Sequence, residues 1–440
     1  MFTSEPSTAQ RIERMLRDTP IIDPHTHVRS DQPNAPDLAS LMSYHWVQTE
    51  LRAVGMPLCD FDPSLPAEER VRRSIPYLRK MRNTAMAWCL FRILRDLYGF
   101  HDHNLDESNY LDLCAQVEAT GKDPSWASSV LRDRCNIRTI VTSLGNRSAD
   151  PSKNPDNLLY MLDAHYLFCP GVATDLLPFF AGRTKKGEYY EALSELFGAR
   201  PATTEQLAMH LRDWLDRTVT GPVRFTNTFL PIEQRFTAPD VSECRSILPR
   251  AAGKVSLTDD EIDALVRFVA WEVLGWHDDH GKAFQIAVGA EYFICEGKSI
   301  PRFQQTWTSE MARAFHHFKN VRFDLMMASE VLTHEVAVLA RQFPNVYLSG
   351  YWWHNFFPGS IERIIGQRIQ MAPMTKIGGF LCDAYYAEWT YGKLAVVKKA
   401  MASAFAHLVE SGFYEEDELP PILHQILHDT PRDLYDLGPR

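Results

Sequence analysis

Short apolar runs alternate with longer amphipathic stretches along most of this 440-residue chain. The short runs have the length and branched composition of β-strands, whereas the stretches between them repeat apolar residues at helical spacing. Because strands and helices alternate, the pattern predicts a parallel sheet wrapped by helices. Eight runs are candidate strands: 21–28, 137–144, 172–179, 222–229, 283–290, 321–327, 345–350 and 376–382.

The third of these runs, 172–179, fits an exposed segment equally well, because it contains Asp175 and Pro178. Helices begin where crossovers between parallel strands are needed. Thr203 stands three residues before Gln206, and Thr258 stands three residues before Glu261, which is the spacing of a capping box.

Eight strand–helix units predict an α/β fold, specifically a (β/α)8 TIM barrel. An open doubly wound sheet would usually carry a glycine-rich phosphate turn after its first strand, and this sequence has none there.

One connection, from residue 29 to 136, is much longer than a crossover requires. It contains amphipathic stretches at 84–100 and 109–119 that are typical of helices. We therefore expect residues 1–28 and 137–440 to form the barrel and residues 29–136 to form a helical insertion. Because the insertion leaves from the carboxyl end of the first strand, it should cover the active-site face.

Composition and charge narrow the class of protein. The chain is 45% hydrophobic and carries a formal net charge of −10, with no sustained run of Lys or Arg. These features predict a folded protein with no nucleic-acid or membrane partner, and they leave a homo-oligomer open. No secretory signal or membrane-spanning segment is visible, and the eight cysteines are scattered without a C-x-x-C pair. The expected location is therefore cytoplasmic, with reduced thiols.

The first candidate strand, IIDPHTHV at 21–28, carries His25 and His27. Side chains two residues apart on a strand share a face, with Cα atoms about 6.6 Å apart, so both imidazoles can bind one ion. The alternative is a pair of polar residues packed inside the barrel, but barrel strands present functional groups at their carboxyl ends. Asp23, on the same face, is expected to orient a ligand histidine.

A third ligand should come from strand 8, which lies beside strand 1 in a closed barrel. Asp383 follows GGFLC at the end of that strand, although it can also be the N-cap of the next helix. The expected cofactor is one divalent metal ion, with zinc as the first choice, bound by His25, His27 and Asp383.

These motifs resemble the amidohydrolase superfamily, and the longer pattern is similar to its uronate isomerase branch. The resemblance rests on DPHTHV, on YHWVQTELRAVGM at 44–56, where His45 lies ten residues before Gly55, and on GYWWHN followed by GGFLCD ending at Asp383. It implies a barrel fold, metal ligation by His25, His27 and Asp383, and an active-site role for His45.

Three positions depart from the pattern of that branch. The arginine found two residues after the aspartate is replaced by Tyr385, the strand-5 histidine falls at Ala287, and the Y-x-R-H segment is missing from TYGKL at 390–394. The lost histidine argues against the two-metal hydrolases of the superfamily. The resemblance therefore bears on the fold and the metal more directly than on the substrate.

The sequence thus predicts a metal-dependent aldose–ketose isomerase that acts on a uronic acid or related sugar acid by proton transfer. The alternatives are a mononuclear zinc hydrolase, lyase or dehydratase acting on a sugar-derived or small carboxylated compound, and a non-catalytic binding protein. The candidate catalytic residues are Asp383, His45 and Tyr385.

Further residues are expected around the substrate. Trp352, Trp353 and His354 follow strand 7 and can form a wall, and arginines can bind a substrate carboxylate at two points. The candidate arginines are Arg29, Arg147 and Arg183. A second histidine-rich cluster, WHDDHGK at 276–282, precedes strand 5 and is expected at the opposite mouth of the barrel.

Overall fold

The structure is a computed structural model that describes residues 5–154, 158–170, 186–230, 237–292, 299–302, 304 and 306–438. Its centre is a parallel sheet whose strands lie side by side in chain order. The strands are β1 (Ile21–Thr26), β2 (Ile137–Ser143), β3 (Leu158–Asp163), β4 (Val223–Leu230), β5 (Ala283–Val288), β8 (Arg322–Met327), β9 (Val346–Ser349) and β10 (Ile377–Gly378). An antiparallel pair, β6 (Ala290–Tyr292) and β7 (Ser299–Pro301), follows β5. The α/β class with an eight-stranded parallel sheet is therefore confirmed.

The two edges of this sheet meet beyond β10. The backbone N–H of Asp383 donates to the carbonyl of His25 at 2.9 Å, and the N–H of His27 donates to the carbonyl of Ala384 at 2.8 Å. These bonds place the end of β1 beside the segment that follows β10.

One strand of the sheet was not among the predicted runs. The third strand of the sheet is Leu158–Asp163, which pairs with β2 on one side and β4 on the other. The predicted run 172–179 lies outside the described residues. The other seven predicted strands coincide with β1, β2, β4, β5, β8, β9 and β10.

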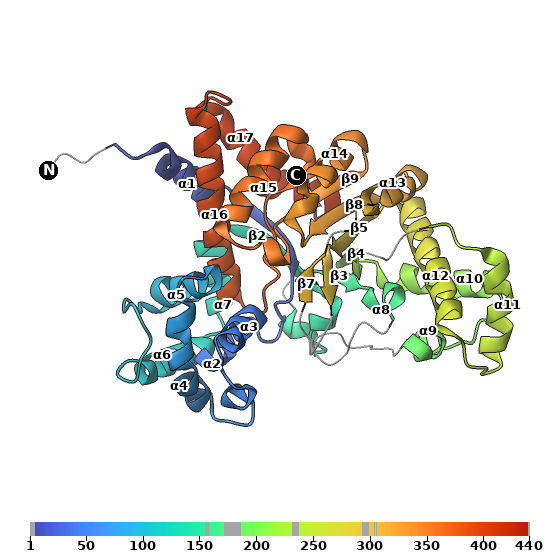
Figure 1. The fold of residues 1–440 in the computed structure, drawn as a ribbon, viewed down its shortest axis with the longest axis horizontal. Coiled ribbons are helices and arrows are strands. Elements are labelled where there is room, and N and C mark those ends of the chain that lie inside the picture. The colour runs from blue at the N-terminus through green and yellow to red at the C-terminus, as the bar shows by residue number, and fades with distance from the viewer. Residues whose placement is uncertain are drawn as a thin grey trace.

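Helices surround the sheet (Figure 1). Those outside the β1–β2 connection are α1 (Thr8–Asp18), α8 (His165–Phe168), α9 (Tyr189–Phe197), α10 (Thr204–Thr218), α11 (Val241–Ala252), α12 (Asp259–His280), α13 (Trp307–His317), α14 (Thr333–Gln342), α15 (Pro358–Met371), α16 (Ala387–Glu410), α17 (Leu419–His424) and α18 (Thr430–Tyr435). The capping box at Thr258 is confirmed. At Thr203 the hydroxyl accepts from the Gln206 N–H, but the Gln206 side chain accepts from Ala202 instead.

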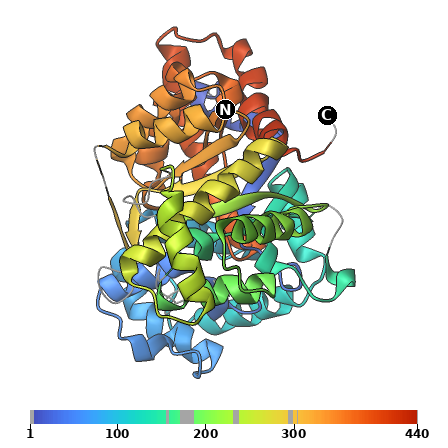
Figure 2. The same cartoon turned by 90° about the vertical axis from the view of Figure 1, so that its right-hand side faces the viewer.

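The connection between β1 and β2 is also helical. It contains α2 (Leu38–Met42), α3 (His45–Ala53), α4 (Ala67–Leu78), α5 (Ala85–Tyr98), α6 (Tyr110–Gly121), α7 (Trp126–Ser128) and the π-helical turn η3 (Ser129–Arg134). In Figure 1 these blue to cyan helices gather at the lower left, and α5 packs against α16. The view in Figure 2 again places the blue helices toward the bottom of the molecule.

Inward-facing side chains close the amino end of the sheet. Phe225 on β4 stacks on Tyr435 of α18 with ring centroids 4.1 Å apart, in a cluster that also holds Leu434, Val141 and Met161. Polar side chains lie above this cluster, toward the carboxyl ends of the strands, where the candidate site is found. Among the described helices, none is long and apolar enough to span a bilayer.

Candidate metal centre

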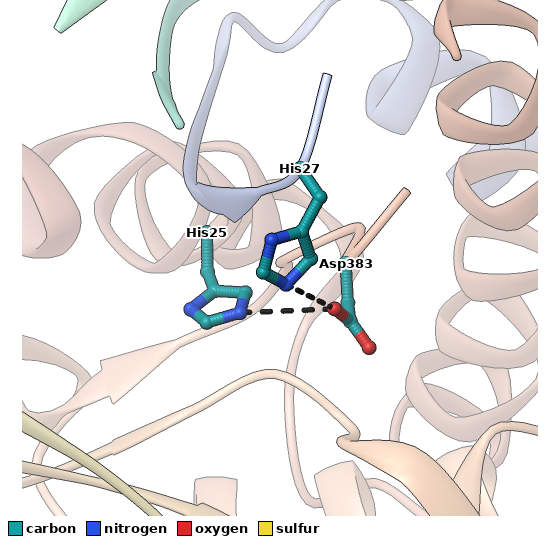
Figure 3. A group of neighbouring side chains, drawn as sticks. All are labelled: His25, His27 and Asp383. Atoms are coloured by element: carbon teal, nitrogen blue, oxygen red, sulfur yellow. Dashed lines mark ion pairs between the residues drawn. The ribbon is translucent and has the colours of Figure 1, made fainter. Parts of the chain in front are cut away.

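Two histidines and one aspartate converge at the carboxyl end of the sheet. His25 lies on β1, His27 is the first residue after β1, and Asp383 lies in the turn after β10. The Nε2 atoms of His27 and His25 lie 3.2 and 3.7 Å from Asp383 Oδ1 (Figure 3). The donor atoms of all three lie within 4.8 Å of one another. Figure 3 shows both rings turned toward the same carboxylate oxygen, so the set can hold one ion.

The ring of His25 is held by Gln285 on β5. The Nδ1–H of His25 donates to Gln285 Oε1 at 2.6 Å, while the Gln285 amide nitrogen donates to the Tyr435 hydroxyl at 2.6 Å and to Asp324 Oδ2 at 3.2 Å. Because the amide oxygen can only accept, His25 carries its proton on Nδ1 and offers the lone pair of Nε2. Burial lowers the pKa of His25 to about 4, so the ring is neutral at ordinary pH. This is the form that a metal ligand requires.

Asp383 is held in a strained backbone conformation. Its φ is 48°, in the left-handed region that side-chain-bearing residues rarely occupy. The ammonium of Lys393 on α16 donates to the carbonyls of Cys382 and Asp383 at 2.5 and 2.9 Å. Burial alone would raise the pKa of Asp383, but the hydrogen bond from His27 and the charge of Lys393 hold it well below its usual range. The carboxylate is therefore ionised.

Asp383 is not a helix cap, because α16 begins at Ala387 and its N-cap is Tyr386.

Asp23 was expected to orient the imidazole of a ligand histidine, but its carboxylate binds backbone groups instead. Asp23 Oδ1 accepts from the backbone N–H groups of Cys382 and His25 at 3.0 and 3.4 Å. It therefore ties the two edges of the sheet together, and Gln285 orients the imidazole instead.

His45 lies at the start of α3 and meets two aromatic side chains. The indole N–H of Trp353 donates to His45 Nε2 at 3.3 Å, and His45 Nδ1 lies 2.9 Å from the Tyr385 hydroxyl oxygen. Burial lowers the pKa of His45 to about 3, so the ring is neutral and its single proton is on Nδ1. His45 thus donates to Tyr385, whose own O–H is left to donate elsewhere.

Asp163 and His165 also face this site, although sequence reasoning missed them. Asp163 ends β3, and its Oδ1 lies 3.8 Å from His165 Nε2. The backbone N–H of Phe229 donates to His165 Nδ1 at 2.7 Å, so the ring proton is on Nε2. Burial raises the pKa of Asp163, and the charge of His27 opposes that rise. The signal in the sequence was LLYMLDAH, an apolar run ending in Asp-x-His.

The predicted wall residues are spread around His45. Trp352 is buried in an apolar cluster with Phe229 and Ala287, whereas His354 packs on Trp46 with ring centroids 5.2 Å apart. Trp353, at φ 53°, is a second residue in the left-handed region beside the site.

Two of the predicted arginines, Arg29 and Arg147, lie in the described part of the chain, and each contacts a neighbouring side chain. Arg29 makes a two-point ion pair with Asp31, with both N···O distances 2.9 Å, and its side chain is half exposed. The guanidinium of Arg147 lies over the ring of Tyr160 at 5.5 Å. Arg183 lies outside the described residues.

A second group in the described part of the chain also has metal-ligand chemistry. His424 and His428 lie 3.1 and 2.9 Å from the two oxygens of Asp429. Arg432 already donates to Asp429 at 2.7 Å, so a cation occupies the position that an ion would need. The WHDDHGK cluster forms the last turn of α12, before β5, where His277 is fully buried.

Several known proteins resemble this chain in sequence or in fold. No protein-family model matches the chain. A uronate isomerase of Thermotoga petrophila is 24% identical over 263 residues, which cover 56% of this chain and only 57% of that protein. A uronate isomerase of Corynebacterium efficiens is 22% identical over 475 aligned positions, covering 99% of this chain and 98% of that protein. The crystal structure of uronate isomerase from Thermotoga maritima superposes with a TM-score of 0.83 at 16% identity, covering 99% of this chain and 100% of that one.

The fold and the His-x-His and Asp group define the class: an α/β protein with a candidate metal centre at the carboxyl end of a parallel sheet. Within this class the chain resembles the uronate isomerases, in sequence and in fold. The resemblance inferred from the motifs is thereby confirmed.

Proposed function

We propose that this chain is a metal-dependent aldose–ketose isomerase that acts on a uronic acid or a related sugar acid. The observation that carries the proposal is the convergence of His25 Nε2, His27 Nε2 and Asp383 Oδ1 in a fold shared with uronate isomerases.

The donor set suits one divalent ion, and zinc is our first choice because two imidazole nitrogens and one carboxylate oxygen are typical zinc ligands. When bound, such an ion polarises the sugar carbonyl and its neighbouring hydroxyl as a Lewis acid. His25 is suited to this because its Nδ1–H donates to Gln285 and leaves Nε2 unprotonated, and His27 directs its Nε2 to the same oxygen of Asp383.

Isomerisation requires a proton to leave C2 and a proton to reach C1. Tyr385 is a candidate for orienting the sugar or handling a proton, because His45 donates to its oxygen. Burial raises its pKa far above the usual range, so the phenol keeps its proton and can act as a hydrogen-bond donor. Asp163 is a candidate acceptor, since burial raises its pKa and makes it a stronger base. The His165 Nε2–H beside it can donate to a substrate oxygen.

The carboxylate of the substrate needs a partner of its own. Tyr385 stands where the similar isomerases have an arginine, and a neutral phenol cannot form a two-point charged pair. We propose Arg29 or Arg183 for this contact, with Trp352, Trp353 and His354 as the substrate-facing wall. The same replacement favours the second candidate, a mononuclear hydrolase, lyase or dehydratase.

We also propose that residues 1–28 and 137–440 form a closed (β/α)8 barrel and that residues 29–136 are an insertion covering its active-site face. Two observations support this: the hydrogen bonds between β1 and the segment after β10, and the position of α3, which brings His45 to Tyr385.

The described cysteines are all free thiols, which supports a reducing, cytoplasmic location.

The test is incubation of the zinc-loaded protein with a panel of uronic acids and sugar acids in D2O, followed by NMR. We expect a ketose product with deuterium at a carbon beside the carbonyl. New fragments would instead identify hydrolysis or elimination, and unchanged substrates across the panel would contradict an isomerase. The matched control is the double variant His25→Ala, His27→Ala, which should leave every substrate unchanged.

A further inference from the structure

A small cavity lies on the outside of the sheet, away from the candidate metal centre, between α1, α5, α16 and the end of η3. Its volume is about 140 Å³. Five basic side chains and a single carboxylate line it: Arg17, Arg92, Arg134, Lys398, Lys399 and Glu13. This excess of positive charge is unexpected in a chain with a net charge of −10.

Helical spacing explains why these side chains meet. Glu13 and Arg17 are four residues apart on α1, and the aromatic Trp88 stands four residues before Arg92 on α5. Residues 391, 394, 395, 398 and 399 share one face of α16. Both α1 and α5 pack against α16, and Figure 1 shows them on the same side of it.

Two of the five cations have partners within the protein. Arg92 forms an ion pair with Asp96, whose carboxylate also accepts from the Tyr391 hydroxyl at 2.5 Å. Arg134 donates to the backbone carbonyl of Asp96 at 3.2 Å. The carboxylate of Asp96 is thus already engaged and does not neutralise the other cations.

The remaining three cations lack such partners. No described residue forms an ion pair or a side-chain hydrogen bond with Arg17, Lys398 or Lys399. Lys398 gives the strongest indication of a bound anion, because its side chain is only 8% exposed. Burial lowers its pKa to about 8 although the charge of Asp18 opposes that shift, which reflects the cost of keeping a charge there with no ion-pair partner. An anion in the cavity would remove that cost.

We propose that this cavity binds a small, doubly charged oxyanion of the phosphate class, held by Lys398, Arg17 and Lys399. Arginine and lysine together provide the charged N–H donors that phosphate oxygens accept. The cavity is well below the roughly 300–1,000 Å³ of pockets for drug-sized ligands, so it fits the oxyanion and excludes a nucleotide. This proposal does not depend on the proposed isomerase activity.

A bound oxyanion would link segments that are far apart in the sequence. Lys398 and Lys399 lie on α16, the helix that also carries Lys393 beneath Asp383, whereas Arg17 lies on α1. The ligand would therefore stabilise the packing of α1 on the helix behind the metal centre, and should raise the unfolding temperature of the protein.

The experiment is isothermal titration of inorganic phosphate into the zinc-loaded full-length protein, with sodium chloride keeping ionic strength constant. We expect one phosphate per cavity, and about tenfold or greater weakening in Lys398→Met and in Arg17→Ala, because each removes a charged hydrogen bond to the ligand. Arg14→Ala is the matched control: Arg14 is exposed on α1 and does not line the cavity, so binding should match wild type.

Phosphate can also bind at a metal, so the titration is repeated with His25→Ala, His27→Ala. Phosphate binding that persists in the His25→Ala, His27→Ala variant but is lost in the cavity variants supports the proposal. Binding that is lost in the histidine variant and unchanged in the cavity variants overturns it, and so does a titration of the wild-type protein that releases no heat. If Lys398→Met does not fold, Arg17→Ala and Lys399→Ala decide, since both residues are exposed. Methyl phosphate in a parallel titration distinguishes a free oxyanion from a phosphate ester.

Discussion

The side-chain oxygen of Gln285 accepts a hydrogen bond from Nδ1 of His25 at 2.6 Å, across the interior of the sheet from β5 to β1. This contact fixes the tautomer of His25 and directs its Nε2 toward Asp383. Gln285 is itself fixed by Asn227, Asp324 and Tyr435. The arrangement of the metal ligands therefore depends on a neutral residue that binds no metal.

Replacing Gln285 by methionine should weaken metal binding without unfolding the protein. Methionine has a similar length but cannot accept from His25, so the ring loses its fixed tautomer. The expected decrease in zinc affinity is about 10- to 100-fold, measured by competition with a chelator. Asn227→Leu is the matched control, because Asn227 donates to the same oxygen at 2.9 Å but does not touch His25. An equal decrease in both variants would show that general packing, not the tautomer, controls affinity.

The purified protein should contain about one divalent ion per chain, since one set of three converging donors is available at the sheet. Metal analysis of His25→Ala, His27→Ala should find almost none. The control is His424→Ala, His428→Ala, which removes the two histidines of the second group and should retain the ion. The assignment is wrong if the ion is lost from this control and kept by the first variant.

Tyr385→Phe should leave the metal content unchanged and lower kcat by about 10²-fold, because it removes a proton-handling hydroxyl and little volume. His45 donates to that hydroxyl, so the loss should appear in kcat more than in KM. Tyr386→Phe serves as the control, because Tyr386 is the N-cap of α16 and its hydroxyl has no role there. If Tyr385→Phe turns over the substrate at the wild-type rate, the Tyr385 hydroxyl handles no proton and the residue only lines the site.

The metal ligands could be predicted from sequence because strand geometry is regular. Alternation places His25, on β1, and His27, one residue past its end, on the same side, and a sheet whose edges meet brings the end of the last strand to them. Gln285 could not be predicted in this way. An amide has no characteristic motif, and its contact with His25 joins residues 260 positions apart.

The missed residues have two different causes. Asp163 and His165 were overlooked because the third strand was placed at 172–179, although LLYMLDAH at 158–165 repeats the strand-end pattern of the first strand. The error at Asp23 was geometric. Its carboxylate satisfies backbone N–H groups of His25 and Cys382, which compete successfully with the imidazole as hydrogen-bond donors.

The stability of the protein should depend on pH through His277. Its ring is fully buried against Phe284, and burial lowers its pKa from 6.5 to about 4. The unfolded chain therefore binds this proton at a higher pH than the folded chain. The stabilisation from the neutral ring is complete above pH 6.5 and is lost as the pH falls toward 4, by about 3 kcal/mol.

His277→Phe keeps the aromatic volume and removes the titrating nitrogen. Urea unfolding at pH 6.5 and at pH 4 should show a smaller loss of stability in this variant than in wild type, by the same few kcal/mol. His101→Gln, which changes an exposed histidine, should follow the wild-type curve. Parallel curves for His277→Phe and wild type would rule out His277 as the source of the pH dependence.

Lys393→Met should destabilise the protein and weaken metal binding together. Lys393 is 4% exposed, and its ammonium donates to two carbonyls of the turn that holds Asp383 at φ 48°. Methionine fills the same space but donates to neither carbonyl, so that of Asp383 keeps the Tyr44 hydroxyl at 3.4 Å and that of Cys382 loses its donor, at a cost of about 2–4 kcal/mol in the free energy of unfolding. The turn can then relax from its left-handed conformation, which moves the carboxylate away from His25 and His27. Lys122→Met removes an exposed ion pair with Glu118 and should change stability by less than about 0.5 kcal/mol. If Lys393→Met unfolds like wild type and binds zinc equally well, the strained turn is held by its other hydrogen bonds, to β1 and to Tyr44.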